Sequence, residues 1–401
     1  MVQGIGDLSP QESLDRLTNM TDGISVIAES EFRQRLQKLQ LCLQSEGYCG
    51  AYLHAGTNLQ YFTGLSWSPS ERMVGAFVPD QGEIVYIAPK FELDTIKDYW
   101  KIQAEVRTWE EHQSPYLLLK EIVENSTSVR QLVLCIDEAT PFFTVSGIQS
   151  AASEFQLTNL QPISIQLRSL KSATEIALIQ RSHQMTMAVI KAAAAALQPG
   201  VTTTEVTDFI NQAYKKVGSP GSYFCIVLFG VTTSFPHGVK NPQTLQSGDA
   251  VLIDTGCRLD GYHSDITRSF CFGEPSDDYR NAWNVEKLAQ TAAFEAAKVG
   301  KTCESCDDAA RQILTENGYG PDYQLPGLPH RTGHGCGLDI HESPNLVRGE
   351  KTKLAPGMVF SSEPMLVIPG QYGIRLEDHF YMNTDNSAWF TPPSLSIENP
   401  F

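Results

Sequence analysis

The chain has 401 residues, of which 41% are hydrophobic, with a formal net charge of −16 at pH 7 and an isoelectric point near 5.0. This length exceeds that of one small domain and predicts two domains with a sizeable core. The acidic balance argues against nucleic acid or an anionic membrane surface as a partner. No apolar run reaches the roughly 18 residues that a membrane span requires, so no membrane-spanning segment is expected.

The amino terminus and the cysteines predict a cytoplasmic protein. The start, Met1-Val-Gln-Gly-Ile-Gly-Asp, has neither the basic region nor the apolar core of an export signal. Nine cysteines, an odd number scattered from Cys42 to Cys336, are typical of reduced thiols. Cys303 and Cys306 form a CxxC with no second pair elsewhere, so we interpret them as the start of a helix and not as a redox pair.

The first part of the chain alternates between helical and strand patterns. A helix is predicted over residues 30–46, where apolar residues three and four apart share one face. The elements predicted after it are strands at 50–54, 73–79, 84–88 and 131–136, with helical stretches near 91–99 and 115–125. This alternation predicts an α/β amino-terminal domain over residues 1–163. Asp137 follows the last of these strands, and a turn or cap is favoured for it over a catalytic acid.

Residues 164–401 are predicted to form a second domain of helices and two β-hairpins. Its helices are one opened by the capping box Ser172-Ala-Thr-Glu175 and ending near Leu197, one opened by the box Thr202-Thr-Thr-Glu205, and two at roughly 277–298 and 304–316. The alanine run 192–196 indicates tight helix packing.

Two aspartates lie on the arms of the first hairpin. An apolar strand from Ala250 meets the two-residue turn signal Asp260-Gly261, and a second strand follows it. This turn pairs Gly256 with Asp265 unless a bulge changes the register. Asp254 and Asp265 then become diagonal neighbours on one face, roughly 7 Å apart at the backbone, a gap that one or two metal ions can bridge.

Two glutamates occupy matching positions in the second hairpin, which is predicted between residues 358 and 382. Pro369-Gly370 and Gly373 mark its turn, and Glu363 and Glu377 lie symmetrically about Gly370. A loop with an odd number of residues places these two glutamates opposite each other on one face.

Five side chains together predict a metal site: Asp254, Asp265, His334, Glu363 and Glu377. Taken singly, each acid is more often a solvated hairpin residue, and a histidine among glycines is more often a loop residue. As a set on apolar segments, however, the four carboxylates would repel one another and lose their hydration. Bound cations or raised pKa values are needed to offset this cost. One nitrogen and otherwise oxygen donors suit Mn, Co, Zn or Fe(II) better than a thiolate-type structural zinc.

These residues lie in ordered motifs that resemble the pita-bread metallopeptidases, the group of methionine aminopeptidase, aminopeptidase P, prolidase and creatinase. The motifs are Asp254-Thr-Gly through Asp265-Ile-Thr-Arg, Gly333-His-Gly-Cys-Gly-Leu-Asp-Ile-His341-Glu-Ser-Pro, Ser362-Glu-Pro and Gly373-Ile-Arg-Leu-Glu377-Asp. They span about residues 165–385. The resemblance implies an α+β pita-bread catalytic domain at 164–401 after a creatinase-like domain at 1–163. The spacing from His334 to Glu363 is similar to that of compact bacterial Xaa-Pro dipeptidases.

The resemblance implies a reaction and a role for each ligand. Two divalent ions, Mn²⁺ first and Co²⁺, Zn²⁺ or Fe²⁺ as alternatives, are expected to be bridged by Asp265 and Glu377. Asp254 lies on one side of the pair, and His334 and Glu363 lie on the other. A bridging hydroxide then attacks the scissile carbonyl, with Glu363 shuttling the proton. Creatinase lacks these ligands, so a metal-free reaction of its type is not expected.

Three further residues are expected beside the metals. The resemblance implies that His237 and His341 contact the substrate and the tetrahedral intermediate, although either is otherwise a surface histidine. Arg375 shares strand parity with Glu377, so it is expected to point toward the cluster and to orient a carboxylate or the substrate; the alternative is a solvated edge arginine. Compact prolidases often carry an arginine that grips the dipeptide carboxylate where this chain has Asn345. Either another cation takes its place, with Arg348, Arg331 and Arg72 as candidates, or the preferred substrate is not a simple dipeptide.

The favoured function is hydrolysis of Xaa-Pro dipeptides, or removal of the first residue of Xaa-Pro peptides, by a homodimer that binds small peptides. A second hypothesis is a non-peptidase of the same fold, either an amide hydrolase or a dimethylsulfoniopropionate lyase. A third is a non-catalytic binding module. Retention of all five metal ligands favours the peptidase.

Overall fold

A computed structural model describes residues 4–126 and 132–401 and divides the chain into two compact units. One unit comprises Ile27–Arg168, and the other comprises Met1–Val26 together with Ser169–Phe401. The expected division after residue 163 falls inside helix α7 (Gln161–Arg168), which belongs to the first of these units.

Residues 4–26 pack with the second unit because its long helix offers them a surface of small side chains. Helix α1 (Pro10–Asp15) contacts helix α8 (Ala173–Ala195), and the Ser13 hydroxyl donates to the Ala192 carbonyl at 2.7 Å. Ala193 and Ala194 are buried in the same core as Leu14. The alanine run therefore serves close packing, as predicted.

The Ile27–Arg168 unit is an α/β domain built on a six-stranded sheet of order β4-β3-β2-β1-β5-β6. Its strands are β1 (Gly50–His54), β2 (Gly75–Pro79), β3 (Val85–Pro89), β4 (Glu105–Trp109), β5 (Val133–Ile136) and β6 (Gln156–Asn159). Its α-helices are α2 (Glu29–Glu46), α3 (Thr57–Thr63), α4 (Leu93–Tyr99), α5 (Pro115–Ser126), α6 (Phe142–Ala151) and α7. The predicted α/β class and the four central strands are confirmed; residue 131 of the predicted fourth strand lies outside the described residues. The edge strands β4 and β6 escaped prediction because they are only partly buried and so lack a clear apolar pattern.

Asp137 is a turn residue, as predicted. Its carboxylate accepts hydrogen bonds from the backbone N–H groups of Ala139 (3.0 Å) and His54 (3.2 Å) and from the Asn58 amide (2.9 Å). The side chain thus ties the end of β5 to β1 and α3.

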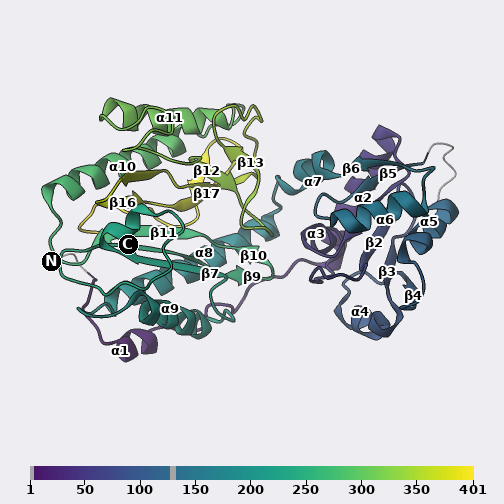
Figure 1. Cartoon of the computed structure of the whole chain (residues 1–401), viewed down its shortest axis with the longest axis horizontal. Helices are drawn as coiled ribbons and strands as arrows, with labels where there is room; N and C mark the ends of the chain where they lie inside the picture. The colour runs from purple at the N-terminus through teal and green to yellow at the C-terminus, as the bar shows by residue number, and fades with distance from the viewer. Residues whose placement is uncertain (1–3, 127–131) are drawn as a thin grey trace. The chain divides into compact units, whose positions relative to one another are not determined.

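The larger unit has the pita-bread architecture, with helices outside two facing sets of strands (Figure 1). The first set is the sheet β11-β8-β7, formed by β7 (Phe224–Phe229), β8 (Ala250–Gly256) and β11 (Ile266–Cys271), with the short pair β9 (Arg258–Leu259) and β10 (Tyr262–His263). The second is the sheet β13-β12-β14-β17-β18 with the pair β15-β16; its strands are β12 (Gly333–Gly335), β13 (Glu342–Leu346), β14 (Val359–Ser362), β15 (Met365–Ile368), β16 (Tyr372–Arg375), β17 (Asp378–Met382) and β18 (Ser387–Trp389).

Two hydrophobic cores hold the helices against these strands. Helices α8 and α9 (Thr203–Val217) share one core with residues of β7, β8 and β11. Helices α10 (Asp277–Ala296) and α11 (Glu304–Glu316) share the other with residues of β14 to β17, centred on Trp283, Phe360 and Phe380. In Figure 1, α10 and α11 run along one side of the strands and α8 and α9 along the other. The inner strand faces are thereby left for polar side chains.

The sequence signals for the helix starts are confirmed. Both predicted capping boxes are present, with Ser172 and Thr202 as the N-caps of α8 and α9. Cys303 is the N-cap of α11, and all nine cysteines are free.

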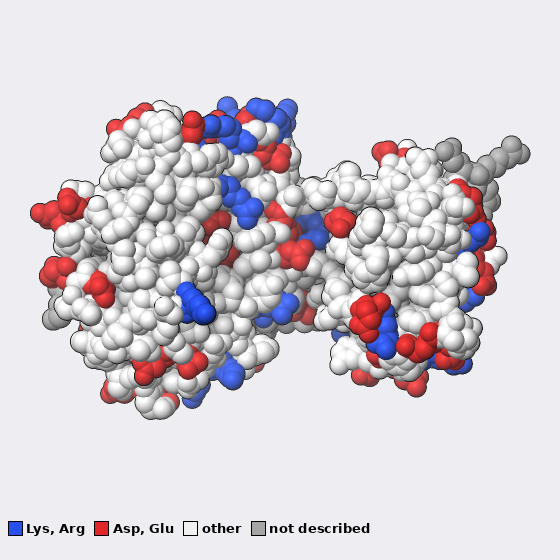
Figure 2. Space-filling view, in the orientation of Figure 1, with Lys and Arg blue, Asp and Glu red and all other residues white. Residues whose placement is uncertain are grey.

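Charge of both signs is mixed over the face of the molecule seen in Figure 2, so the net charge of −16 is not gathered into one acidic surface on this face. Among the described residues, no helix is both long and apolar enough to cross a membrane.

Candidate metal centre

The first hairpin has the predicted register. Leu259 pairs with Tyr262, and Thr267 pairs with Asp254, so the strands continue across Asp265 without a bulge. Asp260 and Gly261 both adopt positive φ, at 50° and 88°, as the two-residue turn requires. Asp254 and Asp265 therefore lie diagonally on one face of the hairpin.

The second hairpin also has the predicted register. Met365 pairs with Arg375 on β15 and β16, and Ser362 pairs with Asp378 on β14 and β17. Both pairs require the same alignment, which sets Glu363 opposite Glu377. The two glutamates lie where the hairpin passes from one short pair of strands to the next.

His334 reaches the cluster because glycines let its strand β12 sit close to its neighbours. A Cβ atom at Gly333 would lie 2.1 Å from the Ser361 carbonyl oxygen, and one at Gly335 would lie 2.7 Å from the Glu342 carbonyl oxygen. The Nδ1–H group of His334 donates to the Gly335 carbonyl at 2.9 Å. Its Nε2 atom is thereby directed at the carboxylates.

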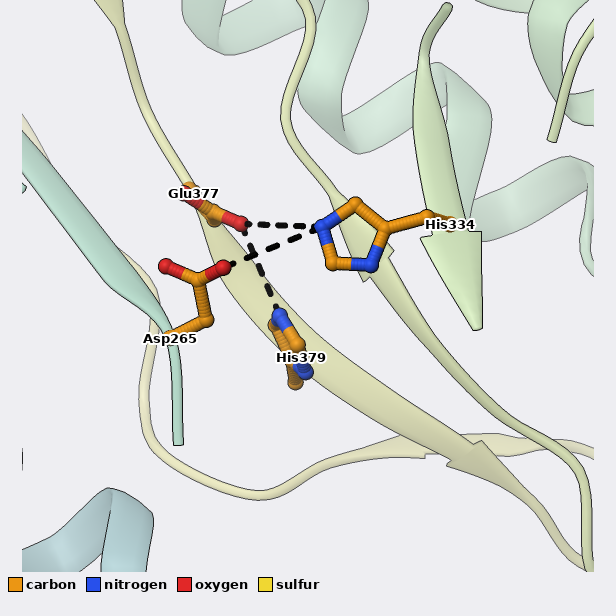
Figure 3. A group of neighbouring side chains, drawn as sticks. All are labelled: Asp265, His334, Glu377 and His379. Carbon is orange, nitrogen blue, oxygen red and sulfur yellow. Dashed lines mark ion pairs between the residues drawn. The ribbon is translucent and has the colours of Figure 1, made fainter. Parts of the chain in front are cut away.

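The predicted ligands meet in one buried cluster. The His334 Nε2 atom lies 3.1 Å from Glu363 Oε1, 3.8 Å from Asp265 Oδ2 and 4.0 Å from Glu377 Oε1. Figure 3 shows the side chains of three of these residues converging, with His334 on β12, Asp265 between β10 and β11, and Glu377 between β16 and β17. One carboxylate oxygen of each of Asp254, Asp265 and Glu377 is buried without a hydrogen-bond partner among the described residues. Unpartnered buried oxygens beside an imidazole nitrogen are donors that fit a divalent cation.

The protonation of the metal-free cluster follows from its burial. Burial raises the pKa of Asp254 to about 6, against the opposing charge of Arg375, and raises that of Glu377 to about 7. Burial and the neighbouring Glu377 raise the pKa of Asp265 well above its usual range. Burial also opposes ionisation of Glu363, but the charge of His334 outweighs it and lowers the pKa of Glu363. At pH 6, a bound cation would therefore displace protons from Asp254, Asp265 and Glu377.

Arg375 orients a ligand carboxylate, which was one of its two predicted roles. Its Nη2 atom lies 2.5 Å from Asp254 Oδ2, and its Nε atom donates to the Thr267 hydroxyl at 3.1 Å. Thr267 in turn donates to Glu377 Oε2 at 2.7 Å, and Nη1 of Arg375 donates to the Pro236 carbonyl. The side chain is 4% exposed. Because every guanidinium nitrogen contacts a protein group, the geometry does not support the predicted substrate-binding role of Arg375.

A second buried arginine fixes the strand that carries Glu377. Arg268, fully buried, donates to the Glu377 carbonyl at 2.9 Å and pairs with Asp378 at 2.6 Å. The Gln290 amide donates a hydrogen bond to the other oxygen of the Asp378 carboxylate at 2.9 Å. Sequence reasoning missed this support; its signal was an arginine within the apolar strand Ile266–Cys271.

His341 lies beside the cluster, in contact with His334. The rings of His341 and His334 meet edge to face, with centroids 4.3 Å apart. Loss of solvation against this ring lowers the pKa of His341 to about 4, and the charges of His334, Arg331 and His237 add to the effect. His341 is therefore neutral at pH 7. His237 is exposed in the loop after β7, close enough for its charge to act on His341.

His379 belongs to the cluster and was not predicted. Its ligand atom and those of Asp265, His334 and Glu377 all lie within 4.8 Å of one another (Figure 3). The available signal was its position two residues after Glu377, which puts both side chains on one face of a strand.

Comparison with known proteins agrees with this site. The model of metallopeptidase family M24 matches residues 177–384, about half of the chain, and that of the creatinase/prolidase N-terminal domain matches residues 35–170. The chain belongs to metallopeptidase family M24. It is 30% identical over 367 residues to YkvY of Bacillus subtilis, covering 90% of this chain and 99% of that protein.

Solved structures are similar over nearly the whole chain. Dipeptidase PepE from Mycobacterium ulcerans superposes with a TM-score of 0.85 at 28% identity, covering 92% of this chain and 97% of that one. The prolidase from Thermococcus sibiricus gives 0.82 at 27% identity, covering 90% and 97%. The Xaa-Pro dipeptidase from Bacillus anthracis gives 0.80 at 26% identity, covering 90% and 98%. The protein is thus a metallopeptidase with dipeptidases and prolidases as structural neighbours.

Proposed function

We propose that this protein is a dipeptidase that hydrolyses Xaa-Pro bonds with two divalent ions. The observation that carries the proposal is that Asp254, Asp265 and Glu377 each have a buried carboxylate oxygen without a partner among the described residues, in the cluster that also holds His334 and Glu363. Such a set is costly unless cations are bound. Prolidase and Xaa-Pro dipeptidase among the similar structures support the substrate class.

The five ligand residues would hold two ions between them. Asp254 would hold one ion and His334 with Glu363 the other, with Asp265 and Glu377 shared. When bound, the ions supply a hydroxide at neutral pH and polarise the scissile carbonyl. Arg375 and Thr267 keep Asp254 and Glu377 in place throughout, since both contact ligand oxygens directly.

Proton movement falls to Glu363 and the flanking histidines. The carboxylate of Glu363 lies at the centre of the cluster, 3.1 Å from His334 Nε2, where it can take a proton from the attacking water and pass it to the leaving nitrogen. Neutral His341 can donate a hydrogen bond to the oxygen of the tetrahedral intermediate, with exposed His237 beside it. The leaving nitrogen of an Xaa-Pro bond carries no N–H, so the pocket must accept a ring at this position.

Arg331 is the cation that we assign to the free carboxylate of a dipeptide. Asn345 pairs with His334 across β12 and β13, so the position of the missing arginine adjoins the metal centre. Arg348 pairs with Asp322 at 2.6 Å, and Arg72 pairs with Glu111 in the other unit. Arg331 is half-buried, and its charge acts on His341. Of the three candidates, Arg331 is therefore the one that lies near the metal centre and forms no ion pair with a carboxylate among the described residues.

A panel of peptides tests the substrate assignment. We expect rapid hydrolysis of Xaa-Pro dipeptides, slower hydrolysis of their C-terminal amides, and slow hydrolysis of Xaa-Ala dipeptides. Equal rates for Xaa-Pro and Xaa-Ala would refute proline specificity, and preference for longer Xaa-Pro peptides would indicate an aminopeptidase. Metal uptake without hydrolysis of any peptide would favour the amide-hydrolase or lyase alternative, and absence of metal uptake would favour a binding module.

We further propose manganese as the first metal to test, a homodimer as the working form and the cytoplasm as the location. Nine free thiols support a reducing compartment. Light scattering that finds only monomer would refute the dimer.

A further inference from the structure

His379 lies on the same face of the strand as the shared ligand Glu377. It pairs with Ser361 of β14, and its side chain is fully buried. Residues two apart on a strand point to the same side, so the fold aims this imidazole at the cluster while Asp378 points to the opposite side, toward Arg268.

The ring of His379 is placed as a donor. Its Nε2 atom lies 3.5 Å from Glu377 Oε1, the oxygen that also faces His334 Nε2 at 4.0 Å. Figure 3 shows this nitrogen turned toward the cluster. Neither ring nitrogen of His379 has a hydrogen-bond partner among the residues that the structure describes. An imidazole buried in this state pays a desolvation cost that a ligand bond would offset.

The surroundings of His379 hold the ring in this position. His183 packs against it with centroids 4.7 Å apart, and His183 is itself stacked on Phe390. His183 has partners for both nitrogens: Nδ1–H donates to the Ile179 carbonyl at 2.8 Å, and Nε2 accepts from the Asp265 N–H at 3.4 Å. The two buried histidines therefore differ, because His183 is satisfied by protein and His379 is not.

We propose that His379 is a nitrogen ligand of the ion held by Asp265, His334 and Glu377. This inference rests on the metal centre of the proposed function and adds a donor outside the five residues identified from the sequence. This ion would then have two nitrogen ligands, whereas the ion held by Asp254 would have none. Nitrogen donors favour Co²⁺, Zn²⁺ and Fe²⁺ over Mn²⁺, so the two sites should differ in metal preference.

Proton NMR of the full chain loaded with Co²⁺ tests the proposal without reference to turnover. A histidine bound through Nε2 to Co²⁺ keeps a strongly shifted Nδ1–H signal that disappears in D₂O. We expect two such signals in the unmodified protein, from His334 and His379, and one in His379→Gln. Co²⁺ affinity in that variant should fall by about 100-fold or more, because even residues that only support a ligand typically contribute 10- to 100-fold.

His54→Gln is the matched control, since His54 is also buried with an unpartnered nitrogen but lies in the other unit. It should leave both signals and the Co²⁺ affinity unchanged. One exchangeable signal in the unmodified protein would overturn the proposal, whether or not the variant folds. Two signals in a protein that hydrolyses no peptide would support His379 as a ligand and refute the proposed function. One signal in an active peptidase would refute His379 as a ligand and leave the proposed function standing.

Discussion

Metal binding should release protons in an amount that depends steeply on pH. The pKa values of Asp254 and Glu377 in the metal-free protein are about 6 and about 7, both raised first by burial. At pH 6 these two carboxyls therefore hold about 1.4 protons between them, and at pH 8 about 0.1. A cation binds the ionised forms, so it must displace these protons. Asp265 and His334, whose pKa values are also raised, add to the release.

Isothermal titration with a divalent ion measures this release when it is repeated in buffers of different ionisation enthalpy. We expect at least about one more proton released at pH 6 than at pH 8, and a corresponding loss of affinity at the lower pH. Equal release at the two pH values, or none at pH 6, would refute the protonation of the cluster.

The raised pKa values of Asp254 and Glu377 also determine how stability depends on pH. In the metal-free protein their contribution to stability falls as pH rises, whereas the contribution of bound metal grows. Both carboxyls have folded pKa values above their unfolded values near 4, so the folded metal-free protein binds more protons than the unfolded chain. This contribution to the free energy of unfolding is present below pH 4 and is lost as pH rises through about 7. Metal binding strengthens over the same range, so the difference in Tm between loaded and chelated protein should widen with pH.

Four substitutions extend the account. Asp265→Ala should abolish both metal uptake, measured by elemental analysis, and turnover; retained stoichiometry would count against its role as a shared ligand. Arg375→Met should destabilise the chelated protein by about 3 kcal/mol at pH 8 in urea unfolding, and by less at pH 5, where Asp254 is protonated. Gly333→Ala should cost about 1–3 kcal/mol, since the added methyl meets a backbone carbonyl at 2.1 Å; an unchanged midpoint would show that β12 can shift. Arg331→Gln should raise KM for dipeptides but not for their amides, whereas the control Arg348→Gln should change neither; equal effects would remove the assignment to Arg331.

The parts of the site that depend on local register could be predicted from the sequence. Asp260-Gly261 fixes one hairpin and the symmetric loop about Gly370 fixes the other, and each alignment brings a pair of acids to one face. Capping boxes and helical periodicity gave the helix starts for the same reason: the determining contacts are only three or four residues apart.

What could not be predicted depends on contacts between distant segments. His379 becomes a donor only because β17 lies beside β14 and across from the Asp265 hairpin, which no local pattern specifies. The role of Arg375 likewise follows from its contact with Asp254, 121 residues away. Residues 4–26 join the unit of Ser169–Phe401 through contacts with α8, which lies more than 140 residues further along the chain.

The most direct test of the central claim is hydrolysis of an Xaa-Pro dipeptide by chelator-stripped protein during stepwise return of a divalent ion. We expect negligible turnover in the stripped protein and a rise that saturates at about two ions per chain. Full turnover before any ion is returned would contradict it.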